Sequence, residues 1–264
     1  MPPPPTLPTF DAPPLVEVVF GRQFDPLPLT AAHTGLFWQR LGRDAYPQVQ
    51  EQPPLPPMIE RFGEDQVSVV ELGDVFALPR LWFTSVTGDA LVQVQRDRFL
   101  VNWRASTTPY PRYVTLRPQF EALWSTFEGF SRAEFDIAPV VQQYELTYVN
   151  HIPWHPDWQD LGAALRFVFP DLGWRPGTRF LPSPEGTDVR LAVRLPKDAG
   201  RLHLRLREGR RKTDGARLFM LEFTARGLLP SASEWFDLAH EWIVHGFADL
   251  TSAEMQEQAW QRRS

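Results

Sequence analysis

The sequence predicts an α+β protein built on antiparallel β-sheet, and three observations support this class. Short segments in which apolar and polar residues alternate recur along the chain, which is typical of strands with one buried face. Longer segments carry apolar residues three and four positions apart, which is typical of helices that cover such a sheet. The same order of elements also occurs twice: one strand, a helix, about four strands and a second helix.

The first series occupies residues 15–135. We expect a strand at residues 15–24, which are rich in β-branched and aromatic residues, and a helix at residues 29–43. Strands are expected at residues 66–72, 81–86, 91–95 and 99–104, with a turn at residues 87–89. A helix at about residues 113–130 completes the series. Its predicted buried side consists of Leu116, Phe120, Leu123, Trp124 and Phe127.

The second series occupies residues 136–250 and repeats this order. A strand at residues 142–152 precedes a helix at 157–169, and further strands are expected at about 178–181, 189–195, 201–208 and 217–224. A long helix begins at Ser231, where Ser231 and Glu234 form a capping-box pattern. Residues 1–14 contain seven prolines and are expected to form a flexible arm, and residues 251–264 a tail or an extension of the last helix.

A β-α-β4-α unit that occurs twice resembles the fold of the TATA-binding-protein-like domains. In that fold two curved antiparallel sheets join into one saddle, with helices on one face. The halves of this chain share little residue-by-residue identity, so we infer a tandem duplication from the order of elements alone. The alternative is the helix-grip fold, in which a curved sheet wraps a long C-terminal helix around a ligand cavity. Neither fold by itself assigns a function.

Composition excludes several kinds of chemistry. The 264 residues include no cysteine, so disulfides, thiolate metal sites and a cysteine nucleophile are impossible. No uncharged apolar segment reaches about 18 residues, so no membrane span is expected, and no secretory signal is recognisable at the start. These features favour a cytoplasmic protein.

Positive charge is concentrated in one part of the second series. Residues 190–226 contain eleven Lys or Arg and four Asp or Glu, a net charge of +7, whereas the whole chain carries −5 and the rest of it therefore −12. A basic sheet region on an otherwise acidic protein suggests an anionic partner.

The alternation within the strands predicts one polar sheet face that no helix covers. In residues 201–207, Leu202, Leu204 and Leu206 point inward, and the Arg and His residues between them point outward. Gln and Asn are uncommon in strands, and beside arginines they suit recognition of a polar or anionic partner. A solvated face without a function is the alternative explanation. The candidate binding residues are Gln93, Gln95, Asn102, Arg104, Arg112, Glu145, His151, Arg201, His203, Arg205 and Arg207.

Familiar catalytic and cofactor motifs are absent from the sequence. It contains no phosphate-binding loop of the GxxxxGKS/T type, no GxGxxG after a strand and no GxSxG elbow. His240 and His245 would lie about 140° apart around a helix, so they do not form a zinc pair. A proline-containing segment separates His151 from His155, and no set of carboxylates completes a metal site there. The sequence therefore favours a protein that is not an enzyme, and no metal or cofactor is expected.

Two motifs are specific enough to suggest a family. Residues 93–104 read QVQRDRFLVNWR, a QxQxxRFxxNWR pattern, and residues 110–113 read YPRY. Together with the strands LVEVVFGRQF and YELTYVN, they resemble a sporadically distributed prokaryotic family of proteins of about this length, which has no assigned function. The resemblance implies a single module with an accessory role that bacteria can gain or lose, and it supplies no catalytic residues. The matching residues are Glu17, Gln93, Gln95, Asn102, Trp103, Arg104, Tyr110, Arg112, Tyr113 and Asn150.

Three functions are compatible with these features. The first is a non-enzymatic binding protein that engages a macromolecule through the polar face, a protein partner being favoured over nucleic acid because most of the chain is acidic. The second is nucleic-acid binding by the basic residues of 190–226, which predicts a steep dependence on salt. The third is a helix-grip pocket for a small ligand, which requires a closed cavity and would be compatible with an enzyme.

Overall fold

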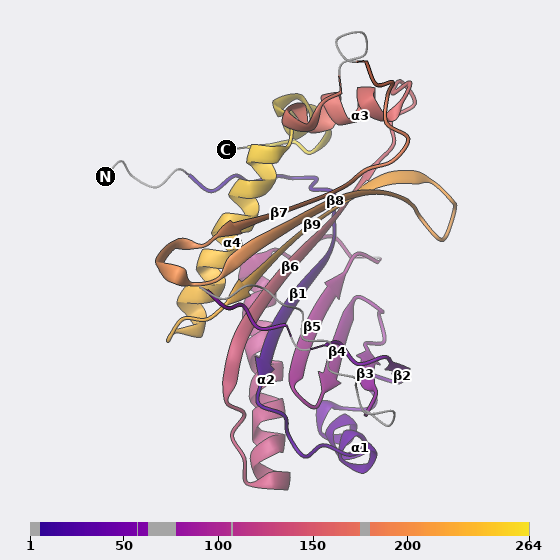
Figure 1. Cartoon of the computed structure of the whole chain (residues 1–264). Helices are drawn as coiled ribbons and strands as arrows, with labels where there is room; N and C mark the ends of the chain where they lie inside the picture. Colours follow the sequence, from indigo (N-terminus) through magenta and orange to yellow (C-terminus); the bar gives the residue numbers. More distant parts are fainter. Residues whose placement is uncertain (1–5, 57, 63–77, 107, 175–179, 264) are drawn as a thin grey trace.

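The structure is a computed structural model that describes residues 6–56, 58–62, 78–106, 108–174 and 180–263. In these residues one nine-stranded antiparallel sheet combines with four α-helices and a π-helical turn, η3 (Met255–Ala259) (Figure 1). The strands of the first series are β1 (Leu15–Phe24), β2 (Gln48–Gln52), β3 (Arg80–Thr84), β4 (Ala90–Gln95) and β5 (Arg98–Arg104). Those of the second series are β6 (Val141–Pro153), β7 (Asp188–Arg194), β8 (Arg201–Arg210) and β9 (Arg217–Gly227). The helices are α1 (Ala31–Leu41), α2 (Tyr113–Phe135), α3 (Leu161–Val168) and α4 (Ala232–Leu250).

The predicted α+β class is confirmed, and the nine strands in the described residues belong to one sheet. Its strand order is β2-β3-β4-β5-β1-β6-β9-β8-β7, so that β1 and β6, the first strands of the two series, pair near its centre. β2 is not evident from the sequence, because four of its five residues are polar. The strand expected at residues 66–72 lies outside the described residues. The strand expected at residues 178–181 lies partly outside them, and its described residues, Phe180 and Leu181, form a bend.

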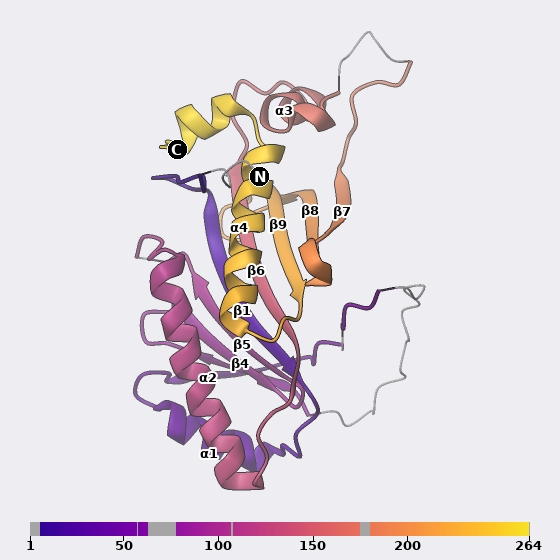
Figure 2. The same ribbon diagram turned by 90° about the vertical axis from the view of Figure 1, so that its left-hand side faces the viewer.

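The long helices cover one face of the sheet, and aromatic side chains fill the space beneath them. Figure 2 shows α2 and α4 on the same side of the sheet, with α1 near one end of α2. The expected apolar stripe on α2 is buried, except for Leu123, which is partly buried. The ring of Phe20 on β1 lies between the two helices, with its centroid 5.3 Å from that of Phe120 on α2 and 5.6 Å from that of Phe236 on α4. In the described part of the chain, no helix is both long and apolar enough to cross a membrane.

One charged side chain, Arg22 of β1, also lies on the helix-covered face. Its guanidinium donates to both carboxylate oxygens of Glu121 on α2, at 2.7 and 2.8 Å, and lies 4.6 Å from the centre of the Trp124 ring. Burial lowers the pKa of Arg22, and the charge of Glu121 opposes this effect. The ion pair with Glu121 compensates for the free-energy cost of burying the charge of Arg22.

The described part of the proline-rich segment is held against the C-terminal residues. Phe10 is buried, forms an isolated antiparallel bridge with Arg262, and packs edge-on against the ring of Phe247 on α4. Asp11 forms an ion pair with Arg263. We expected a flexible arm here because of the prolines. The structure instead anchors the segment, because the aromatic ring among the prolines has an apolar site beside α4.

Replacing Phe120 by Ala should destabilise the protein by about 3–5 kcal/mol, because the ring is fully buried between β1, α2 and α4 and its removal leaves a cavity. Val114→Ala, at a position on the same helix that is 76% exposed, should change the free energy of unfolding by less than about 0.5 kcal/mol. Denaturant unfolding followed by circular dichroism measures both values. Similar effects of the two substitutions would contradict this packing.

Candidate functional site

The sheet face opposite α2 and α4 is called the open face below, and it carries the polar side chains that the alternation predicted. On β8 the alternation is observed, with the three leucines buried and the residues between them partly exposed. The open-face residues of this strand are Arg201, His203, Arg205 and Arg207. Arg201 lies opposite Arg226 of β9, whose guanidinium donates to Glu145 of β6 at 2.7 Å.

The QxQxxRFxxNWR residues form a hydrogen-bonded network on the open face. Gln93 of β4 donates to Asn102 of β5 at 2.6 Å, and Asn102 donates to Glu17 of β1 at 2.7 Å. Glu17 also accepts from Arg104 at 2.8 Å, and Arg80 of β3 donates to Gln93 at 2.9 Å. We expected Gln93 and Asn102 to be exposed, but each is only 4% exposed, because the two amides and their neighbours satisfy one another. These residues tie four adjacent strands together.

An extended segment, residues 53–56 and 58–62, runs across the open face and is called the strap below. It follows β2 and first meets Gln95 of β4. The Oε1 atom of Gln95 accepts from the backbone N–H of Leu55 and its Nε2 atom donates to the Leu55 carbonyl, both at 2.8 Å. Arg98 of β5 donates to the carbonyl of Pro56 at 3.0 Å. The candidate residue Gln95, which we expected to be exposed, is therefore buried beneath the strap.

The second half of the open face holds the strap in the same way. The amide of Gln143 on β6 donates to the Met58 carbonyl at 2.5 Å and accepts from the N–H of Glu60 at 2.7 Å. The carboxylate of Glu60 accepts from Arg201 at 2.6 Å and lies 2.5 Å from Nε2 of His203. Burial would raise the pKa of Glu60, but its hydrogen bonds to His203 and Arg201 outweigh burial and lower the pKa.

Phe62, at the end of the described strap, lies against two guanidinium groups. Its ring centre is 4.4 Å from the guanidinium carbon of Arg194 on β7 and 4.5 Å from that of Arg201, which is cation–π geometry. Glu60 and Phe62 are two positions apart, and both side chains contact Arg201 although the backbone bends at Phe62. Nothing in the sequence distinguishes these two residues from ordinary surface residues. The only signal is the preceding run of prolines, which favours extended structure.

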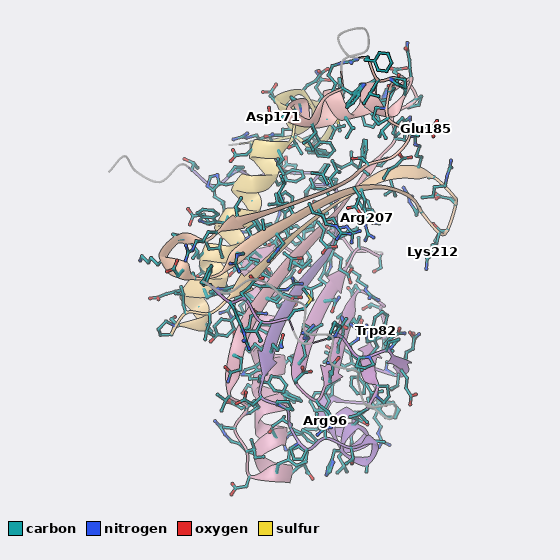
Figure 3. The ribbon with its side chains drawn as sticks, in the orientation of Figure 1. Trp82, Arg96, Asp171, Glu185, Arg207 and Lys212 are labelled. Carbon is teal, nitrogen blue, oxygen red and sulfur yellow. The ribbon has the colours of Figure 1, made fainter. Side chains whose placement is uncertain are left out.

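Beyond the strap, the open face ends in a basic edge formed by β7, β8 and the hairpin that joins β8 to β9. Arg205 donates to both carboxylate oxygens of Asp188, at 3.0 and 2.7 Å, and Arg190 donates to the same carboxylate at 3.3 Å. These hydrogen bonds lower the pKa of Asp188 to about 2. Arg207 lies on β8 near this edge, and Lys212 lies at the tip of the hairpin (Figure 3).

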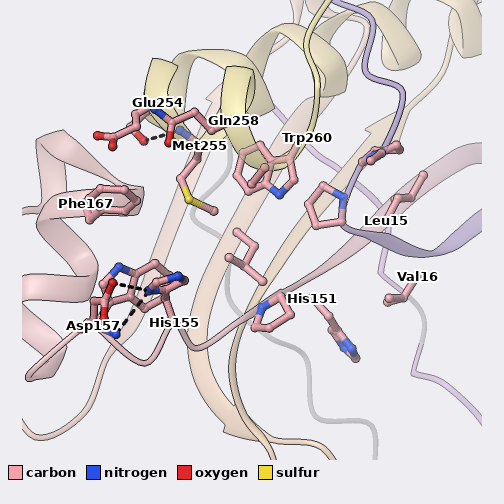
Figure 4. A pocket seen from close by; sticks show the side chains of 18 of the residues that line it. Leu15, Val16, His151, His155, Asp157, Phe167, Glu254, Met255, Gln258 and Trp260 are labelled. Carbon is pink, nitrogen blue, oxygen red and sulfur yellow. Dashed lines mark hydrogen bonds and ion pairs between the residues drawn. The ribbon is translucent and has the colours of Figure 1, made fainter.

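An open groove lies where β6, α3 and η3 approach one another (Figure 4). Its volume is about 1520 Å³, and its walls include Ile152, Phe167 and Trp260. The candidate residue His151 lines this groove, away from the strap. Burial, followed by the charge of Arg211, lowers the pKa of His151.

The YPRY residues lie on the helix-covered side, where α2 meets α4. The hydroxyl oxygen of Tyr148 on β6 lies 3.2 Å from that of Tyr110 and 3.0 Å from Nδ1 of His240 on α4. The ring of Tyr113 stacks on the imidazole of His240 with centroids 4.0 Å apart, and its hydroxyl donates to Asp237. Burial lowers the pKa of His240 to about 4, so the imidazole is neutral at pH 7. This cluster joins the two halves of the protein.

Arg112 is therefore a wrong assignment to the open face. It immediately precedes α2, and its guanidinium donates to the carbonyl of Phe10 at 2.8 Å. The role of Arg112 in this structure is to anchor the N-terminal segment. Within the described ranges, no group of three His, Asp or Glu side chains is arranged to hold a metal ion.

Comparison with models of known protein families and with curated proteins gives no match. Among solved structures, the chain is similar to DynU16, a protein in the dynemicin biosynthetic locus, with 14% sequence identity and a TM-score of 0.25. The similarity covers 65% of this chain and 72% of DynU16. A TM-score this low assigns neither a fold family nor a function.

The stability of the protein should fall between pH 6.5 and pH 4 because of His240. In the unfolded chain this imidazole takes up a proton near pH 6.5, whereas in the folded protein it stays neutral down to about pH 4. Acid in this window therefore favours unfolding, by at most about 3 kcal/mol when both states are protonated. His240→Gln keeps an acceptor for Tyr148 but does not titrate, so it should flatten this part of the curve of stability against pH.

Denaturant midpoints measured at steps across this range test the assignment. His155→Gln is the matched control, because this histidine lies on an exposed loop. If His240→Gln leaves the slope unchanged, another group causes the acid sensitivity.

Proposed function

We propose that this protein is a non-enzymatic binding protein that engages a protein partner through the open face. The observation that carries the proposal is that this face already holds an extended polypeptide segment, through side-chain amides directed at backbone groups. Recognition of an extended chain by its backbone is a common mode of peptide binding. The basic edge beside the strap adds charged groups that can orient a partner.

The arrangement of charge favours a protein over a nucleic acid. Arginines of the open face are paired with carboxylates of the chain itself, as in Arg205 with Asp188 and Arg226 with Glu145. Phosphate groups would have to compete with these acids, and the whole chain carries a charge of −5. A protein surface, which carries both positive and negative groups, is more complementary to these ion pairs than a nucleic acid is.

Two other functions each have an observation in their favour. Arg190, Arg207 and Lys212 at the basic edge would support nucleic-acid binding. The groove of about 1520 Å³ would support binding of a small ligand, as in a helix-grip protein. The groove is open, however, and the helix-grip alternative requires a closed cavity.

We further propose that the two series arose by tandem duplication and that the fold is of the TATA-binding-protein-like type. The sheet order supports this, because β1 and β6 pair at the centre and each is flanked by the last strand of its own series, β5 and β9. The resemblance to a sporadically distributed prokaryotic family supports a cytoplasmic accessory role, for example in a toxin–antitoxin or defence system.

Substitution of Arg205 and Arg207 by Ala should weaken binding of the partner by about tenfold or more, because arginines often dominate interface energies. The tagged protein, gently purified from its host, is analysed by native mass spectrometry for a second polypeptide, and the affinity of that polypeptide is then measured. Arg132→Ala on α2, an exposed arginine on the other side of the sheet, is the control. A partner that binds both variants equally well would place its site elsewhere.

Native mass spectrometry and a salt titration of DNA binding separate the alternatives. An extra mass of a few hundred daltons would indicate a ligand pocket instead of a protein interface. Binding of a generic DNA duplex that falls steeply as salt rises would indicate nucleic acid, because each neutralised phosphate releases counterions.

A further inference from the structure

The open face contacts the strap mainly through groups that any polypeptide backbone possesses. Gln95 both donates to and accepts from the backbone of Leu55. Gln143 does the same with the carbonyl of Met58 and the N–H of Glu60. Because an amide side chain offers one acceptor and two donor hydrogens, it can complete such a pair with any extended segment. These contacts select an extended conformation and not a particular sequence.

Two side chains of the strap are recognised individually. Glu60 has only 8% of its side chain exposed and binds both Arg201 and His203. Phe62 lies against Arg194 and Arg201. Arg201 thus contacts both an acidic and an aromatic side chain, two positions apart on the strap. This is a composite pocket for an acidic residue followed at the second position by an aromatic one.

The strap adds little to the hydrophobic core. Of its apolar residues, Met58 and Ile59 are 47% and 39% exposed, Leu55 and Phe62 are partly buried, and none of the four belongs to the hydrophobic core. The strap is therefore held by hydrogen bonds, ion pairs and a cation–π contact, for which water and solutes compete. A cover of this kind can leave without exposing a large apolar surface.

The surface beneath the strap is also suited to exchange. Gln95, Arg98 and Gln143 are buried polar residues with 6%, 6% and 2% of their surface exposed. A permanently covered layer is stabilised most simply by apolar side chains, because buried polar groups must all find partners. Polar residues here can instead be satisfied in turn by the strap, by water or by another chain.

We infer that the strap is an internal occupant of a peptide-binding track, and that the partner presents an extended segment with an acidic residue followed at the second position by an aromatic residue. This inference rests on the proposed function and specifies the chemistry of the partner. The partner segment takes the place of residues 55–56 and 58–62 on Gln95, Gln143 and the pocket of Arg201 and His203. Because the strap is tethered, it competes for the track at an effective concentration of about a millimolar. A partner therefore binds tightly only if its segment binds the track much more strongly than the strap does.

The test uses a fluorescently labelled peptide with the strap's own sequence, PPLPPMIERF, and the full chain. Wild-type protein should bind the peptide weakly, because its own strap occupies the track. Glu60→Ala weakens the strap's hold, so this variant should bind the peptide at least about tenfold more tightly. Phe62→Ala loosens the strap through a different contact and should act in the same direction. Fluorescence anisotropy measures the affinities, and circular dichroism confirms that the variants are folded.

Two changes test the pocket, and a third serves as a control. A peptide with Gln in place of its Glu should lose most of the gained affinity, and so should the original peptide when Arg201→Ala is added to Glu60→Ala. Arg132→Ala in the same background should leave the affinity unchanged, since Arg132 lies on α2, away from the strap.

The inference is overturned if both strap variants bind the peptide no better than the wild type, or if the Gln peptide binds equally well. A dimer of the strap variants in native mass spectrometry would mean that a second copy of the chain supplies the bound segment, and it would overturn the inference of a separate partner. Retention of a co-purified partner that depends on Arg205 and Arg207 would leave the proposed function standing in either case, so the two failures are distinguishable.

Discussion

The pairing of β1 with β6 is the interaction on which the rest of the structure depends. Each of these strands begins one of the two series, and their register from Leu15 to Phe24 holds the halves side by side. On one face the pairing brings α2 and α4 together over Phe20. Across this junction Tyr113 of the YPRY motif stacks on His240, and Tyr110 contacts Tyr148, which in turn contacts His240. On the other face it produces one polar surface long enough for the strap to reach strands of both halves.

The open face combines two kinds of polar structure with different consequences. The network of Gln93, Asn102, Glu17 and Arg104 is closed on itself and binds adjacent strands to one another. Gln95 and Gln143, by contrast, direct their amides towards the backbone of the strap. Amides in strands therefore serve both rigidity and recognition in this protein, and their position relative to the strap decides which.

Sequence reasoning predicted what depends on local periodicity. The alternation on β8 and the stripe on α2 follow from which side chains are buried away from water, and both are present. It could not predict the burial of Gln93 or of Arg22, since each depends on partners from distant strands or helices. The position of the strap could not be predicted for the same reason. The sequence of a loop without an apolar pattern does not indicate which surface the loop contacts. Arg112 was misplaced because a shared motif does not indicate a shared face.

The contact between Phe10, Arg262 and Phe247 also constrains the order in which the chain can fold during translation. Phe10 emerges from the ribosome before every strand of the sheet, but its partners emerge only after both series have been made. The groove also forms only late in synthesis, because residues 12–16 form one wall and residues 254–260 another. A nascent chain therefore carries an unpaired aromatic residue and an incomplete sheet edge for most of its synthesis. Such surfaces are those that ribosome-associated chaperones protect from aggregation.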